Sequence, residues 1–105
     1  LNPRAPFPYL SAIAEVHFSL GDLDAALAIS TEALERNPEA LRQRLLQGAI
    51  FAEMGRIEDA EWEVVEALAL ESGIRAINLP DIYPFREDDV LMRLKQALRS
   101  AGLPG

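Results

Sequence analysis

Few side chains in this sequence are of the kinds that catalyse reactions or bind metal ions. His17 is the only histidine and cysteine is absent, so no second imidazole or thiolate stands at metal-ligand spacing. The hydroxyl residues lack the sharp glycine-flanked turn that exposes a serine nucleophile; they include Ser11, Ser19, Ser30 and Thr31. No glycine-rich loop that could cradle a phosphate is present. We therefore predict no catalytic residue, no metal site and no cofactor, and we expect that the chain is not an enzyme.

Acidic residues gather in two places, and we interpret both as structural. They are Glu58, Asp59, Glu61, Glu63 and Glu66 in one predicted helix, and Glu87, Asp88 and Asp89 at the start of another. Carboxylates near a helix N-terminus favour the helix dipole, and further along a helix they usually solvate an outer face. A calcium loop needs alternating oxygen ligands around a central glycine, and neither run has that pattern.

Composition narrows the class of partner. The 105 residues are 50% hydrophobic and carry a formal net charge of −7, which argues against a nucleic-acid partner. No run approaches the ~20 apolar residues of a membrane span, and residues 1–6 have no apolar segment of a signal peptide. We expect a cytoplasmic protein that does not bind membranes.

Because the chain starts without Met, we infer that it was cut from a longer protein.

Apolar spacing, glycines and prolines divide the chain into five predicted helices. Apolar residues recur at i, i+3, i+4 and i+7 over segments of about 8–20, 22–37, 38–55, 57–71 and 88–100. Gly21 and Gly55 end the first and third helices, because glycine adopts a left-handed C-cap at little cost. Asp22 caps the second, and Asp88 or Asp89 caps the fifth. Residues 74–86 hold two prolines and no helical stripe, so we predict an ordered apolar connector there.

Much of the chain repeats at a distance of 34 residues, the distance from Gly21 to Gly55. The paired positions are Leu23 with Ile57, Ala26 with Ala60, Ala33 with Ala67, Leu34 with Leu68, and Ala14 with Gly48. A 34-residue period is typical of a solenoid of helix pairs. Such arrays commonly bind other proteins along a concave face.

The alternation of long and small apolar residues resembles the tetratricopeptide repeat, whose pattern is W-x2-L-G-x2-Y and then A-x3-F-x2-A…P. In the first repeat the matching positions hold Leu10, Ile13, Ala14, His17, Ala26, Ser30, Ala33 and Pro38. In the second they hold Arg44, Gln47, Gly48, Phe51, Gly55, Ala60, Val64, Ala67 and Ser72. Arg44, Gln47 and Ser72 depart from the pattern. Leu1-Asn2-Pro3 also resembles Arg36-Asn37-Pro38, so we expect an upstream repeat.

A second resemblance covers most of the chain. It rests on Leu1-Asn2-Pro3-Arg4, Tyr9-Leu10, Leu34-Glu35-Arg36-Asn37-Pro38, Tyr83-Pro84-Phe85-Arg86 and Leu98-Arg99-Ser100-Ala101-Gly102-Leu103-Pro104. In this order they look like the C-terminal tetratricopeptide end of bacterial adenylate/guanylate cyclase-type signalling proteins. That resemblance implies that catalysis lies upstream of these residues.

The repeat resemblance implies which residues bind a partner, because the first helix of each pair lines the concave groove in that family. The implied protein-binding residues are Ser11, Glu15, Ser19, Arg42, Leu45, Leu46, Ala49 and Glu53. Some relatives clamp a C-terminal carboxylate with Lys and Asn, but here the matching positions are Ser11, Glu15 and Leu46. A mixed apolar groove of this kind suits an amphipathic helix, or an upstream part of the same chain.

Two single residues need a separate interpretation. His17 falls where the repeat has an aromatic residue, so we expect a packed, hydrogen-bonded imidazole rather than a ligand. Trp62 lies outside the repeat stripe, and we expect it to pack against the connector or the fifth helix. The alternative for Trp62 is an exposed anchor for a partner, because Trp is enriched at binding hot spots.

The sequence thus predicts an all-α right-handed superhelix of two tetratricopeptide repeats with a connector and a capping helix. We expect one domain: 1–5 ending an upstream repeat, 7–38 and 39–72 as repeats, 73–86 as connector and 87–105 as cap. The expected function is protein–protein interaction or scaffolding, with self-association through the N-terminal end. The alternative is a regulatory or oligomerisation tail of a cyclase-type enzyme. A small all-α hydrolase or lyase lacks a cluster of catalytic groups, and a helix-turn-helix lacks a basic face.

Overall fold

The computed structural model describes residues 6–83, 85 and 88–105, and for Asp88 the backbone alone. Expected features of residues 1–5, 84, 86 and 87 therefore lie outside the described part. The described residues form α-helices, one 3-10 turn and no strands, so the all-α class is confirmed for them. The elements are α1 (Phe7–Ser19), α2 (Leu23–Arg36), α3 (Leu41–Glu53), α4 (Ile57–Leu70), η1 (Ala76–Asn78), α5 (Leu79–Ile82) and α6 (Asp88–Ser100).

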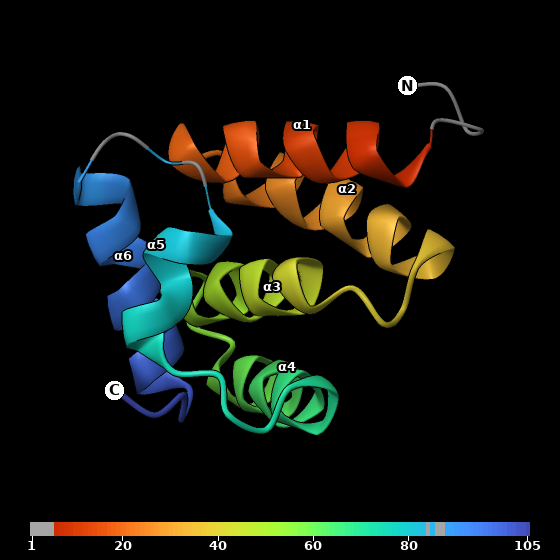
Figure 1. Cartoon of the computed structure of the whole chain (residues 1–105). Helices are drawn as coiled ribbons and strands as arrows, with labels where there is room; N and C mark the ends of the chain where they lie inside the picture. The colour runs from red at the N-terminus through yellow and green to blue at the C-terminus, as the bar shows by residue number, and fades with distance from the viewer. Residues whose placement is uncertain (1–5, 84, 86–87) are drawn as a thin grey trace.

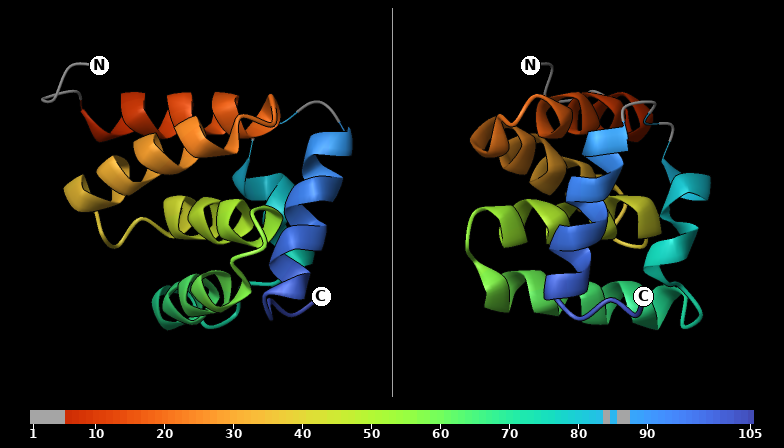
Figure 2. Two further views of the ribbon diagram at one scale, coloured as in Figure 1. Left: turned by 180° about the vertical axis from the view of Figure 1, so that it is seen from behind. Right: turned by 90° about the vertical axis from the view of Figure 1, so that its left-hand side faces the viewer.

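The first four helices form two pairs, α1 with α2 and α3 with α4, stacked one on the other through α2 and α3 (Figure 1). Figure 2 shows α6 crossing the ends of this stack, with α5 beside it. The principal contacts of α6 are with α3. Its apolar stripe includes Val90, Leu94 and Leu98, which are buried there. The helix at residues 88–100 was predicted at the bounds that the structure has.

The two helix-to-helix turns have the same backbone geometry, as their glycines predicted. Gly21 has φ +79° and Gly55 has φ +81°, a left-handed conformation that glycine adopts without strain. In the first turn the Asp22 N–H donates to the His17 carbonyl at 2.9 Å. In the second the Arg56 N–H donates to the Phe51 carbonyl at 2.8 Å. The Asp22 side chain also accepts from the Ala25 N–H at 3.4 Å, so the predicted cap of α2 is confirmed.

Small residues are buried where the paired helices meet. Ala14, Ala26 and Ala60 are fully buried. A Cβ added to Gly48 would lie 3.4 Å from Glu63 Cβ and 3.6 Å from the Ala60 carbonyl oxygen, so α3 and α4 approach closely there. These four positions are two of the pairs that repeat at 34 residues.

The connector is more regular than predicted. We expected no helix between residues 74 and 86, but η1 and the short helix α5 lie there. Pro80 is accommodated in the first turn of α5, where its missing N–H would have no helical partner. The Ala76 N–H donates to the Pro104 carbonyl at 2.7 Å, which joins the connector to the residues after α6. Pro80 therefore did not exclude a helical turn.

A candidate functional site on the inner face of α1 and α3

We call the side of α1 and α3 that is turned toward α5 and α6 the inner face. The eight predicted binding residues differ widely in exposure. Leu45, Leu46 and Ala49 are fully buried and belong to the core. Ser11 and Glu15 are also buried, whereas Ser19, Arg42 and Glu53 are partly exposed. Three of the five residues on α3 and two of the three on α1 are therefore buried by the chain itself.

Aromatic residues after α5 lie against the inner face. The Tyr83 hydroxyl donates to the Arg42 carbonyl, and its ring stacks on Phe85 with 5.6 Å between centroids. The Phe85 ring in turn lies 6.4 Å from that of Phe18 on α1. Burial raises the pKa of the Tyr83 hydroxyl well above its usual value, and the Glu15 carboxylate adds to this. Sequence reasoning did not assign these two aromatic residues to the predicted site.

Two of the predicted residues form an ion pair between α1 and α3. Arg42 Nε lies 2.6 Å from Glu15 Oε2, and Nη2 lies 2.5 Å from Oε1. The hydrogen bond to Glu15 raises the pKa of Arg42, against the opposing effect of burial. The Arg42 guanidinium also lies over the Tyr83 ring, 5.3 Å from its centroid. The structure thus brings Glu15 and Arg42 together as a neutralised polar pair on an otherwise apolar surface.

A second arginine anchors α6 to the same face. The Arg93 guanidinium pairs with Glu53 of α3 and donates to the Phe18 carbonyl at 3.0 Å and the Ser19 carbonyl at 3.4 Å. It also lies over the Phe18 ring, 4.6 Å from the centroid. Those two carbonyls belong to the C-terminal end of α1, where a cation is favoured by the helix dipole. Glu53, predicted to face a ligand, faces α6 instead.

A buried polar cluster between α3 and α4 corrects our interpretation of Glu63. We placed Glu63 on a solvated outer face, but it is 3% exposed. Its carboxylate accepts from Arg44 at 3.0 Å and from Gln47 at 3.4 Å. Burial raises the pKa of Glu63, and Arg44 and Gln47 partly offset that rise. Arg44 and Gln47 stand where the repeat pattern expects apolar residues, so their polarity was the available sign of a buried partner.

The surroundings of Trp62 and of His17 both differ from those that we predicted. Trp62 is 55% exposed, and the Arg44 guanidinium lies 5.5 Å from its ring centroid. Its expected packing on the connector or the fifth helix is therefore wrong. His17 is partly exposed, and its Nδ1 lies 3.4 Å from Asp22 Oδ2 without hydrogen-bond geometry. The expected hydrogen bond of the His17 imidazole is therefore not formed within the described residues.

Two neighbouring hollows lie along α1 on the inner face. One has a volume of about 320 Å³ and is lined by Ala12, Glu15, Val16, Ser19, Arg42 and Phe85. The other, about 230 Å³, is lined by Phe7, Pro8, Ser11, Ala12 and Arg42. Both include Ala12 and Arg42, so they are adjacent, and we call the two together the α1 groove. Four of the eight predicted residues line it: Ser11, Glu15, Ser19 and Arg42.

No family model, no curated protein sequence and no solved structure matches this chain. In the described part of the chain, no group of three or more His, Cys, Asp or Glu residues could hold a metal ion. None of the helices described is long and apolar enough to cross a membrane. The assignment of a function therefore depends on the surfaces of the structure and on the sequence pattern.

Proposed function

We propose that this chain is a protein-interaction or scaffolding module made of two tetratricopeptide repeats in a right-handed superhelix. Residues 7–38 and 39–72 are the repeats, and α6 is the cap. Two observations support this: the turns at Gly21 and Gly55 share one hydrogen-bond pattern 34 residues apart, and small residues occupy the close contacts within each pair. The module binds a peptide or helix on its inner face.

The main support for binding is that the inner face already holds an amphipathic helix of the chain itself, α6. α6 packs on α3 through Leu94 and Leu98, both fully buried, while Arg93 is anchored by α1 and α3. A face that accepts one helix in this way has the shape and the apolar character of a helix-in-groove site. The α1 groove continues this surface beside Phe85, and it is where a second polypeptide has room.

The chemistry of the α1 groove indicates its ligand. Ala12, Val16 and Phe85 give an apolar lining, and the two charges within it, Glu15 and Arg42, neutralise each other. Such a surface favours the apolar side of an amphipathic helix over a charged peptide end. This agrees with the lack of the Lys and Asn residues that clamp a carboxylate.

The experiment is a selection of helical peptides from a display library against the full chain, followed by binding measurements on variants. Val16→Arg adds a charge to the groove, and the matched control Val65→Arg alters an equally exposed valine on α4. Their exposed fractions are 56% and 62%, so neither should unfold the protein. We expect Val16→Arg to weaken binding about tenfold or more, because a charge meets an apolar contact, and Val65→Arg to leave it unchanged.

Two results would contradict the proposed binding of a helix in the α1 groove. Peptides that bind both variants alike would locate binding outside the α1 groove. A library that yields no binder, although both variants fold, would contradict a helix-binding function.

A second candidate is the regulatory or oligomerisation tail of a cyclase-type enzyme, with catalysis upstream of this chain. The exposed apolar side of α1 favours it, because Tyr9, Val16 and Leu20 are all more than half exposed there. An upstream helix pair or a second copy of the chain would cover them. Sedimentation of the wild type and of Leu20→Glu tests self-association: a dimer that the variant disrupts supports it, and a monomer at high concentration contradicts it.

A further inference from the structure

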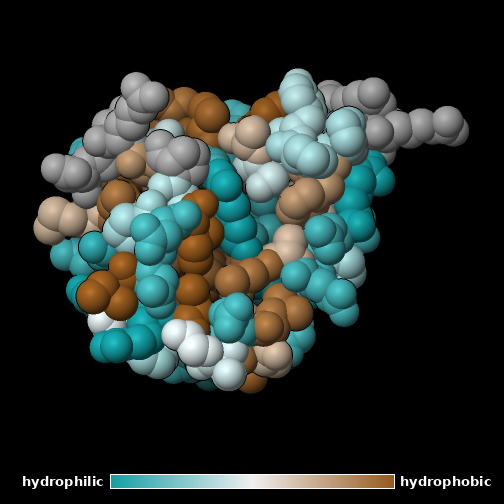
Figure 3. All heavy atoms as spheres, in the orientation of Figure 1, coloured by the Kyte–Doolittle hydropathy of each residue, from teal (hydrophilic) through white to brown (hydrophobic). Residues whose placement is uncertain are grey.

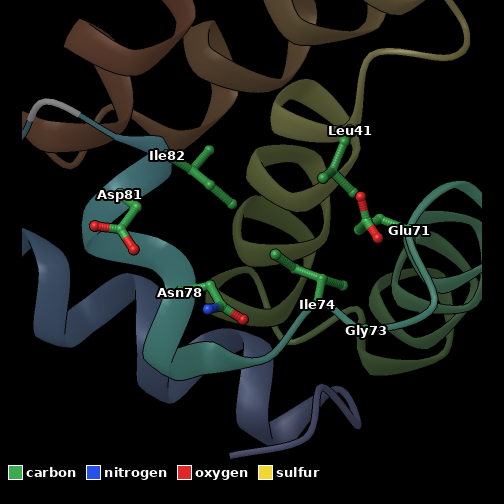
Figure 4. A pocket seen from close by; sticks show the side chains of 7 residues that line it. All are labelled: Leu41, Glu71, Gly73, Ile74, Asn78, Asp81 and Ile82. Atoms are coloured by element: carbon green, nitrogen blue, oxygen red, sulfur yellow. The ribbon is translucent and has the colours of Figure 1, made fainter.

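A separate cavity of about 400 Å³ lies where the start of α3, the end of α4 and the connector meet (Figure 4). Its apolar lining comes from Leu41, Ile74 and Ile82, and the carboxylates of Glu71 and Asp81 lie on its two sides. The space-filling view of this side of the molecule has a hydrophobic strip bordered by hydrophilic groups (Figure 3). The cavity therefore combines an apolar wall with negative charge at its edge.

The charged residues that line this cavity, Glu71 and Asp81, are both acidic. Among the described residues, no arginine or lysine lines it, and neither the Glu71 nor the Asp81 carboxylate has a hydrogen-bond or ion-pair partner. Glu71 also follows the last turn of α4, which holds no basic residue. The negative end of the α4 dipole is thus left without a compensating side chain in the described part of the chain. All three features favour a bound cation.

Elsewhere in this molecule, arginine occupies sites of this chemistry. Arg42 pairs with Glu15 and lies over Tyr83, Arg44 pairs with Glu63 and lies over Trp62, and Arg93 pairs with Glu53 and lies over Phe18. In each case one guanidinium meets both a carboxylate and an apolar surface. In those three cases the apolar surface is an aromatic ring, whereas the cavity between α3, α4 and α5 offers carboxylates beside an aliphatic surface, with no arginine among its lining residues.

We propose that this cavity binds an arginine side chain of a partner polypeptide. The methylene stem lies against Leu41, Ile74 and Ile82, and the guanidinium pairs with Glu71 or Asp81. Arginine suits the site better than lysine because a guanidinium is more weakly hydrated and lies more readily beside apolar groups. The inference does not depend on what binds in the α1 groove, since the two sites have different linings.

The direct test is an NMR titration of the full chain with a blocked five-residue peptide, four alanines around a central arginine. The matched control has citrulline, a neutral analogue of arginine, at the centre, with sodium chloride added to equal ionic strength. The arginine peptide should shift the amide signals of Gly73, Ile74 and Ile82 with a Kd on the order of 1–10 mM. The citrulline peptide should give no saturable shift, and a lysine peptide should bind more weakly than arginine.

Two carboxylate variants test whether Glu71 and Asp81 bind the arginine of the peptide. Glu71→Gln or Asp81→Asn should weaken binding of the arginine peptide about threefold or more, as expected for an exposed ion pair. The matched variant Glu35→Gln removes an exposed carboxylate from α2 and should leave binding unchanged. If all three variants bind alike, or if citrulline binds as well as arginine, the proposal is overturned.

A tethered ligand gives an independent test. Gly73 lines the cavity, and an added Cβ would meet no atom within 4 Å, so a side chain fits there. Gly73→Arg should have a Tm about 2 °C above that of Gly73→Gln. The difference should vanish when Glu71→Gln and Asp81→Asn are added. Equal Tm values in the unmodified background would count against the site.

The chain's own arginines are the competing occupants. Arg4 and Arg86 lie outside the described residues, so Arg4→Ala and Arg86→Ala are included in the titration. Unchanged affinity for the peptide supports a partner. A marked gain in affinity with either variant would mean that the chain fills its own cavity, and the partner proposal would be wrong.

Discussion

Arg93 of α6 and Glu53 of α3 form a two-point ion pair, with 3.0 Å from Nε to Oε2 and 2.5 Å from Nη2 to Oε1. Because the same guanidinium donates to the carbonyls of Phe18 and Ser19, one side chain joins α6 to both helices of the inner face. Its second contact, the added carbonyl bonds and its lower exposure distinguish it from the exposed, single-contact pair of Arg56 with Asp59. We therefore expect this pair to help hold α6 in place.

Replacing Arg93 by alanine should lower the free energy of unfolding by about 1–3 kcal/mol, since hydrogen bonds to charged groups are among the stronger ones. Arg93→Lys should recover little of this loss, because an ammonium group cannot reproduce the two-point contact. Urea unfolding monitored by circular dichroism measures both. Lys95→Ala on the same helix is the control, and a loss as large as that of Arg93→Ala would contradict the anchoring role.

Tyr83→Phe should destabilise the protein by about 1 kcal/mol, because the Arg42 carbonyl loses its hydroxyl donor. Tyr9→Phe, at the exposed second tyrosine, should change stability little. The pKa of the folded Tyr83 is raised, so the wild type should lose stability as pH rises above the unfolded value of about 10. Tyr83→Phe should reduce this alkaline loss; thermal unfolding at several pH values would show whether it does.

Glu63 should make the protein less stable as pH rises, contrary to the usual behaviour of a paired carboxylate. Its folded pKa is raised, chiefly by burial, so the folded state retains the proton at pH values where the unfolded chain has lost it. This contribution is present below the unfolded pKa and is lost as pH rises through the folded one. Carbon-13 NMR of the side-chain carboxyl groups should find that Glu63 titrates above the ordinary glutamate value of about 4.3, and a lower value would refute the assignment.

Gly48→Ala should destabilise by about 1 kcal/mol, despite the higher helix propensity of alanine. The new methyl would lie 3.3 Å from Leu98 Cδ2 and 3.4 Å from Glu63 Cβ, and both neighbours are buried. Gly73→Ala is the control, because nothing lies near its added Cβ. Adding Leu98→Val should recover part of the loss relative to Leu98→Val alone; no coupling between the two substitutions would argue against this contact.

Deleting residues 86–105 should greatly lower Tm, because α6 covers α3 through Val90, Leu94 and Leu98. Large-to-small changes at such buried positions cost about 2–5 kcal/mol each, so Leu94→Ala alone should have a clear effect. Differential scanning calorimetry measures both variants. An unchanged Tm after the deletion would mean that the cap is dispensable.

Local signals allowed much of the fold to be predicted from the sequence. The ends of α1 and α3 follow from Gly21 and Gly55, because the left-handed φ that each needs is a property of glycine itself. The cap of α2 at Asp22 and the span of α6 follow from short-range patterns of the same kind. These elements could be predicted because the interactions that fix them lie within about one turn of helix.

The candidate site was only partly predictable, because its contacts span long sequence distances. Four predicted residues line the α1 groove, but Leu45, Leu46 and Ala49 are fully buried in the core. Contacts between distant residues, such as Tyr83 with Arg42, also shape this face, and no local pattern encodes them. The spacing of apolar residues along α4 did not predict that Glu63 lies against α3 rather than in solvent.

The path of α6 across the helix stack has a consequence for folding cooperativity. Helix pairs that touch only their neighbours can open one at a time, beginning at an end. Here a single helix is bonded to α1 through Arg93 and packs on α3 and α4 near Gly48, so neither pair can open without disturbing it. Because these contacts join distant parts of the chain, we expect all-or-none folding, slower than that of a stack with local contacts only, rather than stepwise opening.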